Sequence, residues 1–116
     1  MNKTRILDAY IECALWSSTD ENDEPLDSNY YPSDLAPECL SQMRSDVHDF
    51  IASNESDLEG LTDDQIGHDF WLTRNRHGAG FWDRGLGDQG DILTKACRPY
   101  GGVFLYAGDD GMIHCG

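Results

Sequence analysis

The uneven distribution of negative charge along the 116-residue chain is the feature that most constrains its fold. Of the 22 Asp and Glu residues, 16 lie in residues 1–66 against three Lys and Arg, which gives that segment a net charge of −13. Residues 67–116 carry six acidic and five basic residues, a net charge of −1. Since charged side chains are rarely buried without a partner, the acidic positions of the first segment mark the outer faces of its elements.

The composition predicts one folded domain spanning residues 1–116. Hydrophobic residues make up 39% of the chain and aromatic residues 10%, which is too apolar for a disordered acidic tail. Lys3, Arg5 and Asp8 interrupt the apolar residues near the N-terminus, and no long uncharged run follows. We therefore expect neither a signal peptide nor a membrane span, and a cytosolic protein.

The four cysteines, Cys13, Cys39, Cys97 and Cys115, are widely separated and form no CxxC pair. Without an export signal, disulfides are not expected. A zinc site is not expected either, because only Cys115 has a neighbouring histidine, His114, and adjacent strand residues point to opposite faces. We expect four free cysteines in the core, and no metal or cofactor.

Apolar spacing predicts a central helix over residues 4–18. Its apolar stripe covers most of the circumference and comprises Ile6, Leu7, Tyr10, Ile11, Cys13, Ala14, Leu15 and Trp16. The narrow polar strip holds Asp8 and Glu12, which are spaced i, i+4 and so lie about 6 Å apart. Residues 19–32 combine acidic residues with Pro, Ser and Asn and predict a solvated loop.

A second helix is predicted to begin near Ser33 or Ala36, with Pro37 in its first turn. Its buried stripe comprises Cys39, Met43, Val47, Phe50 and Ile51, and its outward face comprises Glu38, Gln42, Asp46 and Asp49.

A capping box at residues 62–65 starts a third helix that ends by Arg76. A fourth, short helix is predicted over residues 88–98. Residues 103–107 and 112–115 flank a Gly-Asp-Asp-Gly turn and predict a β-hairpin, so the fold class is α+β.

Residues 68–85 form the densest cluster of functional side-chain types, and three interpretations stay open. In the first, Arg74, Arg76 or Arg84 and the following glycines hold an anion, although no phosphate-binding motif is present. In the second, His68 or His77 acts as a base that Asp69 or Asp83 orients, although no nucleophile signature accompanies it.

The third interpretation is structural and is favoured, because aromatic and glycine clusters usually serve packing and turns. Here Phe70, Trp71, Phe81 and Trp82 are core anchors, and Arg84 pairs with Asp83 or Asp88. The cluster remains the candidate site for a small molecule or a partner. Its residues are His68, Arg74, Arg76, His77, Trp82, Asp83 and Arg84.

The acidic segment suggests a second kind of site, in which carboxylates imitate the phosphates of DNA. Sixteen carboxylates, at the duplex density of one charge per about 1.7 Å, correspond to about 27 Å of DNA. Such a surface would occupy the nucleic-acid groove of another protein. The alternative is that the acidity serves only solubility.

One run of residues resembles a family of small, uncharacterised acidic proteins encoded by tailed bacteriophages and prophages. The resemblance is carried by Phe70-Trp71-Leu72-Thr73-Arg74-Asn75 and His77-Gly78-Ala79-Gly80-Phe81-Trp82-Asp83-Arg84-Gly85. Weaker similarity extends to Leu7-Asp8-Ala9-Tyr10, to residues 33–38 and to the turn at residues 108–111. This chain departs from the family's pattern at Arg76, where the pattern has Gly. The resemblance implies no activity, but small acidic phage proteins include inhibitors of restriction, CRISPR and repair enzymes.

We therefore expect a phage accessory protein, not an enzyme, that binds a basic, nucleic-acid-binding host protein in the host cytoplasm. The carboxylates predicted to form the binding face are Asp8, Glu12, Asp20, Glu21, Asp23, Glu24, Glu38, Asp46 and Asp49. The alternatives are a small ligand-binding domain or enzyme built on the cluster at residues 68–85, and a structural or assembly component.

Overall fold

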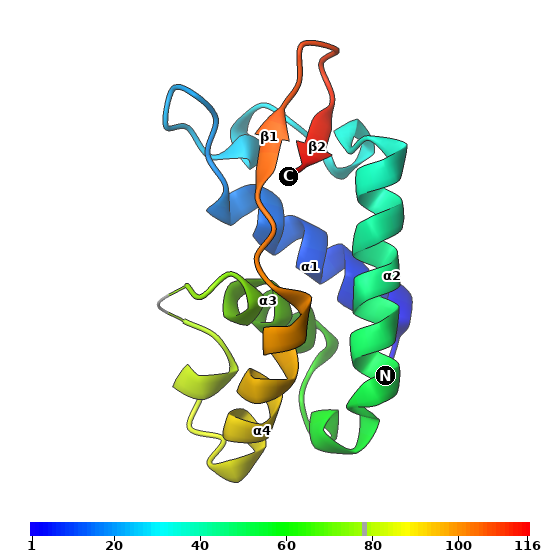
Figure 1. Cartoon of the computed structure of the whole chain (residues 1–116), viewed down its shortest axis with the longest axis vertical. Helices are drawn as coiled ribbons and strands as arrows, with labels where there is room; N and C mark the ends of the chain where they lie inside the picture. Colours follow the sequence, from blue (N-terminus) through cyan, green and yellow to red (C-terminus); the bar gives the residue numbers. More distant parts are fainter. Residues whose placement is uncertain (78) are drawn as a thin grey trace.

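A computed structural model describes residues 1–77 and 79–116, and these residues form four α-helices and one two-stranded antiparallel sheet (Figure 1). The helices are α1 (Lys3–Ser17), α2 (Pro37–Ser53), α3 (Asp63–Arg74) and α4 (Asp88–Cys97). The strands are β1 (Leu105–Ala107) and β2 (Ile113–Cys115), which close the chain as a hairpin. The predicted α+β class, with four helices and a C-terminal hairpin, is confirmed. No helix in the described chain is long and apolar enough to cross a membrane.

Helix α1 lies in the centre of the molecule and packs mainly against α3 (Figure 1). Gly67 of α3 makes this approach possible, because a Cβ there would stand 2.7 Å from the backbone nitrogen of Tyr10. The predicted stripe is buried with one exception. Trp16 is 63% exposed, so its assignment to the stripe was wrong.

The core between α1, α2 and α3 is built on aromatic rings. Phe50 of α2 stacks on Phe70 of α3 with the ring centroids 4.1 Å apart. Tyr10 packs against the edge of Trp71, and Tyr100 packs edge-on against Phe70. The predicted anchors Phe70, Trp71 and Phe81 are buried as expected. Trp82 was wrongly placed among them, because it is 51% exposed.

Helix α2 begins as predicted, with Ala36 as the N-cap and Pro37 as its first residue. All five residues of its predicted stripe are buried. The segment before it is less solvated than expected, because Leu26 is fully buried in a short 3-10 helix at Leu26–Ser28. A single apolar residue in an acidic loop therefore fixes the loop to the core.

Helix α3 starts at the predicted cap, where the Thr62 side chain accepts a hydrogen bond from the Gln65 backbone N–H. It ends in a Schellman motif. The backbone N–H of His77 donates to the Leu72 carbonyl at 3.0 Å, and that of Arg76 donates to the Thr73 carbonyl at 3.1 Å. Arg76 has a φ of 55°, so a non-glycine residue occupies the left-handed position that usually takes glycine.

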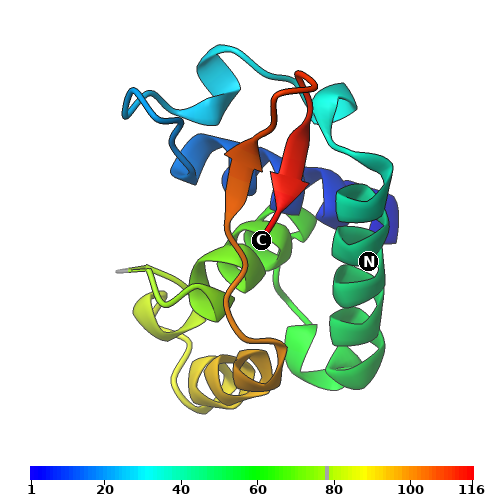
Figure 2. The same ribbon diagram turned by 45° about the horizontal axis from the view of Figure 1, so that its top comes forward.

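The hairpin packs beside the start of α2 (Figure 2). The Ala36 backbone N–H donates to the Ile113 carbonyl at 2.8 Å. This packing brings Cys39 of α2 and Cys115 of β2 together as a disulfide with a Cα–Cα distance of 5.3 Å. The expectation of four free cysteines was therefore wrong for this pair. It rested on the absence of an export signal and on the wide spacing of the cysteines, and neither shows that two elements 76 residues apart pack together.

We predict that the disulfide contributes strongly to stability. Closing a loop of this length removes conformational entropy from the unfolded chain, by an amount that corresponds to about 4 kcal/mol. Reduction, or the double substitution Cys39→Ala and Cys115→Ala, should lower the free energy of unfolding measured by urea denaturation. Reductant should leave the double variant unchanged, and the prediction fails if the wild-type midpoint is the same with and without reductant.

We predict that Arg76→Gly stabilises the protein. A left-handed backbone costs an L-residue about 1–2 kcal/mol, and the greater freedom of glycine in the unfolded chain offsets part of that gain. The free energy of unfolding should rise by about 0.5–1 kcal/mol. Arg76→Ala is the matched control, because it removes the charge but keeps the Cβ. Equal stability of the two variants would refute the backbone explanation.

Candidate functional site

A hollow of about 590 Å³ lies along the second half of α1 and combines aromatic with acidic side chains. We call it the α1 groove. It is lined by Glu12, Cys13, Leu15, Trp16, Asp27, Tyr30, Tyr31, Pro32 and His68. Trp16 and Tyr31 are 63% and 72% exposed, so two large rings face solvent beside two carboxylates.

The acidic loop that follows α1 has its own internal order. The Asp20 carboxylate accepts hydrogen bonds from the backbone N–H groups of Asn22 and Glu24, at 2.8 and 3.0 Å. Asp20 therefore holds the loop together, whereas Glu21, Asp23 and Glu24 are exposed. The loop leaves the C-terminal end of α1 (Figure 1), and Leu15 and Trp16 of that end line the α1 groove.

The remaining predicted carboxylates lie elsewhere. Asp8 lines a separate hollow, which Arg44 and His48 also line. Glu38 is exposed at the start of α2. Asp46 was expected to face solvent, but it forms an ion pair with Arg74, and Asp49 accepts a hydrogen bond from the Tyr100 hydroxyl. The nine carboxylates therefore occupy several surfaces, and Glu12 is the one that lines the α1 groove.

Arg74 is buried at the end of α3, where it joins three parts of the chain. Its guanidinium donates to the Tyr10 hydroxyl of α1 at 3.0 Å and to the Asp46 carboxylate of α2 at 2.8 Å. It also donates to the backbone carbonyls of Tyr100 and Gly101, at 2.9 and 3.0 Å. A buried cation with this many partners is structural, so Arg74 is not free to hold an anion.

The pKa values around Arg74 follow from its burial. Burial would lower the pKa of Arg74, but Tyr10 and Asp46 outweigh it and raise that pKa above its ordinary value. Burial raises the pKa of Tyr10 to about 12, against the opposing effect of Arg74. The hydroxyl of Tyr10 therefore stays protonated and accepts the hydrogen bond from Arg74 as a neutral group.

Arg84 pairs with Asp69, not with Asp83 or Asp88 as expected. Its guanidinium contacts both oxygens of the fully buried Asp69 carboxylate, the shortest contact being 2.9 Å. The hydrogen bond to Asp69 raises the pKa of Arg84. Because this pairing occupies Asp69, its predicted role as the orienting partner of a catalytic histidine is not supported.

A second hollow, of about 740 Å³, lies between the end of α3 and the end of α4. We call it the basic pocket. It is lined by Thr73, Arg74, Asn75, Arg76, His77, Trp82, Thr94, Arg98, Gly101 and Gly102. Of the loop residues predicted as a site, it collects Arg74, Arg76, His77 and Trp82, while His68 lines the α1 groove and Asp83 and Arg84 line neither hollow. Gly78 lies outside the described residues.

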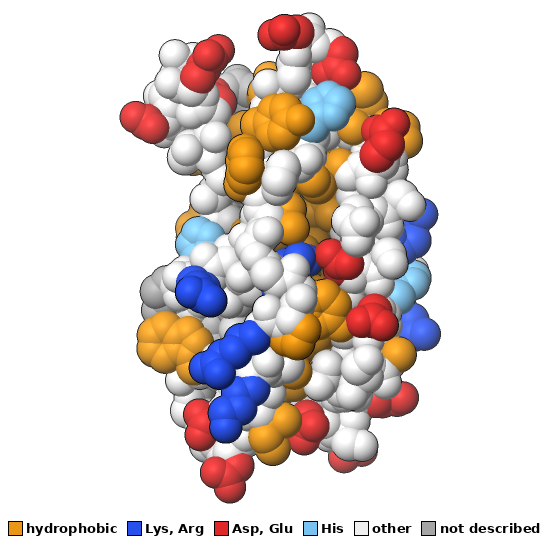
Figure 3. All heavy atoms as spheres, viewed as in Figure 1, with side chains coloured by type: hydrophobic (Ala, Val, Ile, Leu, Met, Phe, Trp, Pro, Cys, Tyr) orange, Lys and Arg blue, Asp and Glu red, His pale blue; other side chains and the backbone are white. Residues whose placement is uncertain are grey.

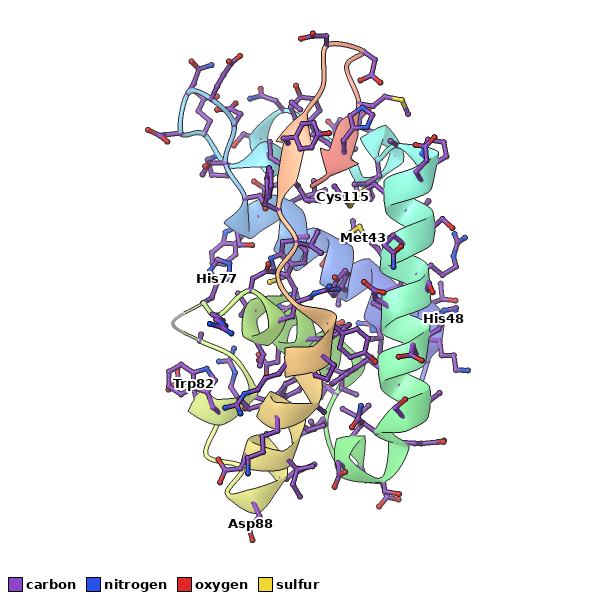
Figure 4. The ribbon with its side chains drawn as sticks, in the orientation of Figure 1. Met43, His48, His77, Trp82, Asp88 and Cys115 are labelled. Atoms are coloured by element: carbon purple, nitrogen blue, oxygen red, sulfur yellow. A yellow bond between two sulfur atoms is a disulfide. The ribbon has the colours of Figure 1, made fainter. Side chains whose placement is uncertain are left out.

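His77 and Trp82 lie on the same side of the molecule (Figure 4), and both line the basic pocket. Lys and Arg side chains gather on this side, over α4 and the end of α3 (Figure 3). Within residues 1–77 and 79–116, Arg76, Lys95 and Arg98 take part in no ion pair. The basic pocket thus has unneutralised cations in a chain of net charge −14.

Neither free thiol is suited to nucleophilic attack. Cys13 and Cys97 are buried, and burial raises the pKa of each thiol to about 12. A thiol with so high a pKa is almost entirely protonated at neutral pH, whereas the thiolate is the reactive form. Among the residues that the structure describes, no group of three or more His, Cys, Asp or Glu side chains is placed to hold a metal ion.

Sequence reasoning gave no site role to five aromatic or charged residues of these hollows, Trp16, Asp27, Tyr30, Tyr31 and Arg98. Trp16 follows Glu12 by four residues, one helical turn, and this spacing was a signal that the ring lies beside the carboxylate. Arg98 follows Lys95 by three residues, which places both cations on one side of a helix end. Tyr31 gave no such signal, because its exposure depends on how the loop packs on α1.

Comparison of the chain with models of protein families, with curated proteins and with solved structures finds no match in any of the three. The function is therefore inferred from the geometry and charge of the chain's own residues.

We predict that Arg74→Met destabilises the protein by about 3 kcal/mol, because it leaves the partly buried Asp46 carboxylate and two carbonyls without their donor. Urea denaturation measures the loss. Arg76→Met is the control, since it removes an exposed guanidinium two residues further along the chain, and it should cost less than about 0.5 kcal/mol. A similar loss in both variants would show that Arg74 has no special role.

Proposed function

We propose that this protein binds a basic, nucleic-acid-binding protein through the α1 groove and the acidic loop beside it. The observation that carries the proposal is the pairing of exposed aromatic rings with carboxylates in that groove. Trp16, Tyr30 and Tyr31 lie there with Glu12 and Asp27. Solubility would explain the acidic residues, but it does not explain why aromatic rings are exposed in a hollow; such exposed apolar surface is typical of a binding site.

The chemistry of the groove favours an arginine or lysine side chain as the group it receives. Aromatic faces attract cations, and the neighbouring carboxylates of Glu12 and Asp27 add a direct charge partner. Tyr and Trp are also the residues that most often dominate the binding energy of protein interfaces. The groove would therefore supply the affinity, and the surrounding charge would guide the approach.

The unneutralised acidity of the chain supports a partner with a basic surface. Within the described residues, three of the 22 carboxylates form ion pairs with arginine, those of Asp46, Asp64 and Asp69, and Asp110 lies 3.0 Å from Nε2 of His114. The others present negative charge to solvent or to local hydrogen-bond donors. A polyanionic surface competes with nucleic acid for a basic groove, because both neutralise the same cations.

As an accessory protein of a tailed phage, the chain would act in the cytoplasm of the host cell and inhibit a defence or repair protein. No catalytic step is involved in this proposal. The inhibition would come from occupancy of the partner's nucleic-acid groove by the carboxylates of the α1 groove and the acidic loop.

A capture experiment with DNA as the competitor tests the proposal. The immobilised protein is incubated with host lysate, and bound proteins are eluted with duplex DNA and, separately, with salt. We expect a protein that binds DNA by itself, that duplex DNA displaces, and whose retention falls steeply as ionic strength rises.

Paired variants separate the groove from general acidity. Glu12→Gln with Trp16→Ala should abolish capture of the DNA-displaced protein. Asp109→Asn with Phe104→Ala removes the same two kinds of group from the hairpin and should retain it. The proposal is wrong if no captured protein is displaced by DNA, or if both double variants lose it equally.

A further inference from the structure

We propose that the basic pocket binds a nucleoside phosphate, with the base stacked on Trp82 and the phosphate held by Arg76 and Arg98. This inference does not depend on the proposed docking of a basic protein. It concerns a different hollow, lined by residues of α3, α4 and the segments that follow them.

The first argument is the unbalanced charge of the pocket. Arg76 and Arg98 line it, and neither takes part in an ion pair within the described chain. Both residues are exposed, so their guanidiniums are available to a ligand. In a chain with 22 carboxylates, two unpaired arginines at one hollow form a site for an anion.

The second argument is the position of Trp82. Its neighbour Phe81 is fully buried and donates its backbone N–H to the Thr73 hydroxyl at 3.1 Å. Gly80 packs so closely on Thr73 that a Cβ there would meet the Thr73 hydroxyl. These contacts anchor the backbone next to Trp82, whose side chain lines the pocket with half of its surface exposed. An exposed indole presents a face on which a nucleobase stacks, a contact worth about 1–3 kcal/mol.

The third argument is the backbone at Arg76. An L-residue in the left-handed conformation is unfavourable, and glycine would relieve it. Backbone strain of this kind is concentrated at functional sites. The side chain that carries this cost lines the basic pocket. Arg76 therefore lowers the free energy of unfolding relative to glycine, but it places a guanidinium at the pocket.

The size and charge of the pocket favour a single nucleotide over a nucleic-acid strand. A hollow of about 740 Å³ lies within the range of small-molecule sites. The charges of Arg76 and Arg98 match that of one phosphate monoester, about −1.5 to −2 at pH 7. A strand would extend beyond them and meet the repulsion of a chain with net charge −14.

Titration with nucleotides tests the inference. AMP, ADP and ATP are added to the isotope-labelled protein at up to about 1 mM, a concentration that detects binding with a Kd of up to about 1 mM. The indole N–H signal of Trp82 is followed by NMR, and the affinity is measured by calorimetry. We expect the Trp82 signal to shift with the nucleotides. Adenosine and inorganic phosphate, which each offer half of the chemistry, should bind at least about tenfold more weakly.

Three variants assign the contacts. Trp82→Leu and Arg98→Gln should each weaken nucleotide binding by about tenfold. Arg76→Gly should weaken it while raising stability, so that the loss of binding cannot come from unfolding. Lys95→Gln is the control, because it removes a charge from the same side without lining the pocket.

Four results would overturn the inference. These are no shift of Trp82 with any nucleotide, equal binding of adenosine, equal weakening by Lys95→Gln and Arg98→Gln, and tighter binding of a single-stranded oligonucleotide than of the mononucleotides. The last result would show that the pocket is part of a strand-binding surface.

Discussion

The buried guanidinium of Arg74 is the interaction on which the arrangement of the helices depends. A charge taken out of water is unfavourable unless all of its donors are matched, so its partners cannot move independently. Those partners come from α1, from α2 and from the turn after α4. The same guanidinium lies 5.5 Å from the centre of the Phe70 ring, within the aromatic core. One side chain of α3 thus fixes the positions of α1, α2 and the turn after α4 relative to α3.

Local patterns were sufficient to predict the elements but not their partners. Apolar spacing placed the helices, and the Thr62 cap and the glycine turn placed their boundaries and the hairpin. Two of the errors concern long-range contacts, the disulfide and the pairing of Arg84 with Asp69. Two others concern which rings enter the core, because apolar spacing did not show that Trp16 and Trp82 are exposed. Of the seven residues of the predicted loop site, the structure assembles four around a pocket whose further cation, Arg98, comes from the end of α4.

Each of the two hollows contains an exposed tryptophan beside charged side chains, and the sign of that charge differs between the hollows. Trp16 lies with Glu12 and Asp27, whereas Trp82 lies with Arg76 and Arg98. Aromatic contact area is similar for many ligands, so under the two proposals the sign of the neighbouring charge would select the class of ligand for each hollow. Helix α3 contributes to both, through His68 at the α1 groove and Thr73 at the basic pocket. A molecule with a single overall charge can in this way offer two surfaces of different selectivity.

The disulfide between Cys39 and Cys115 divides the chain into a covalent ring and a free arm. The ring contains α3, α4 and the basic pocket, whereas α1 lies in the arm. In an oxidised but unfolded molecule, the ring shortens the search by which α2 meets the hairpin. The contacts of α1 gain less from it, since α1 lies outside the ring, with Ser17 and Trp71 54 residues apart along the chain and Tyr10 and Arg74 64 apart. Because closing long loops limits folding rates, docking of the arm into the ring should be the slow step of oxidative refolding.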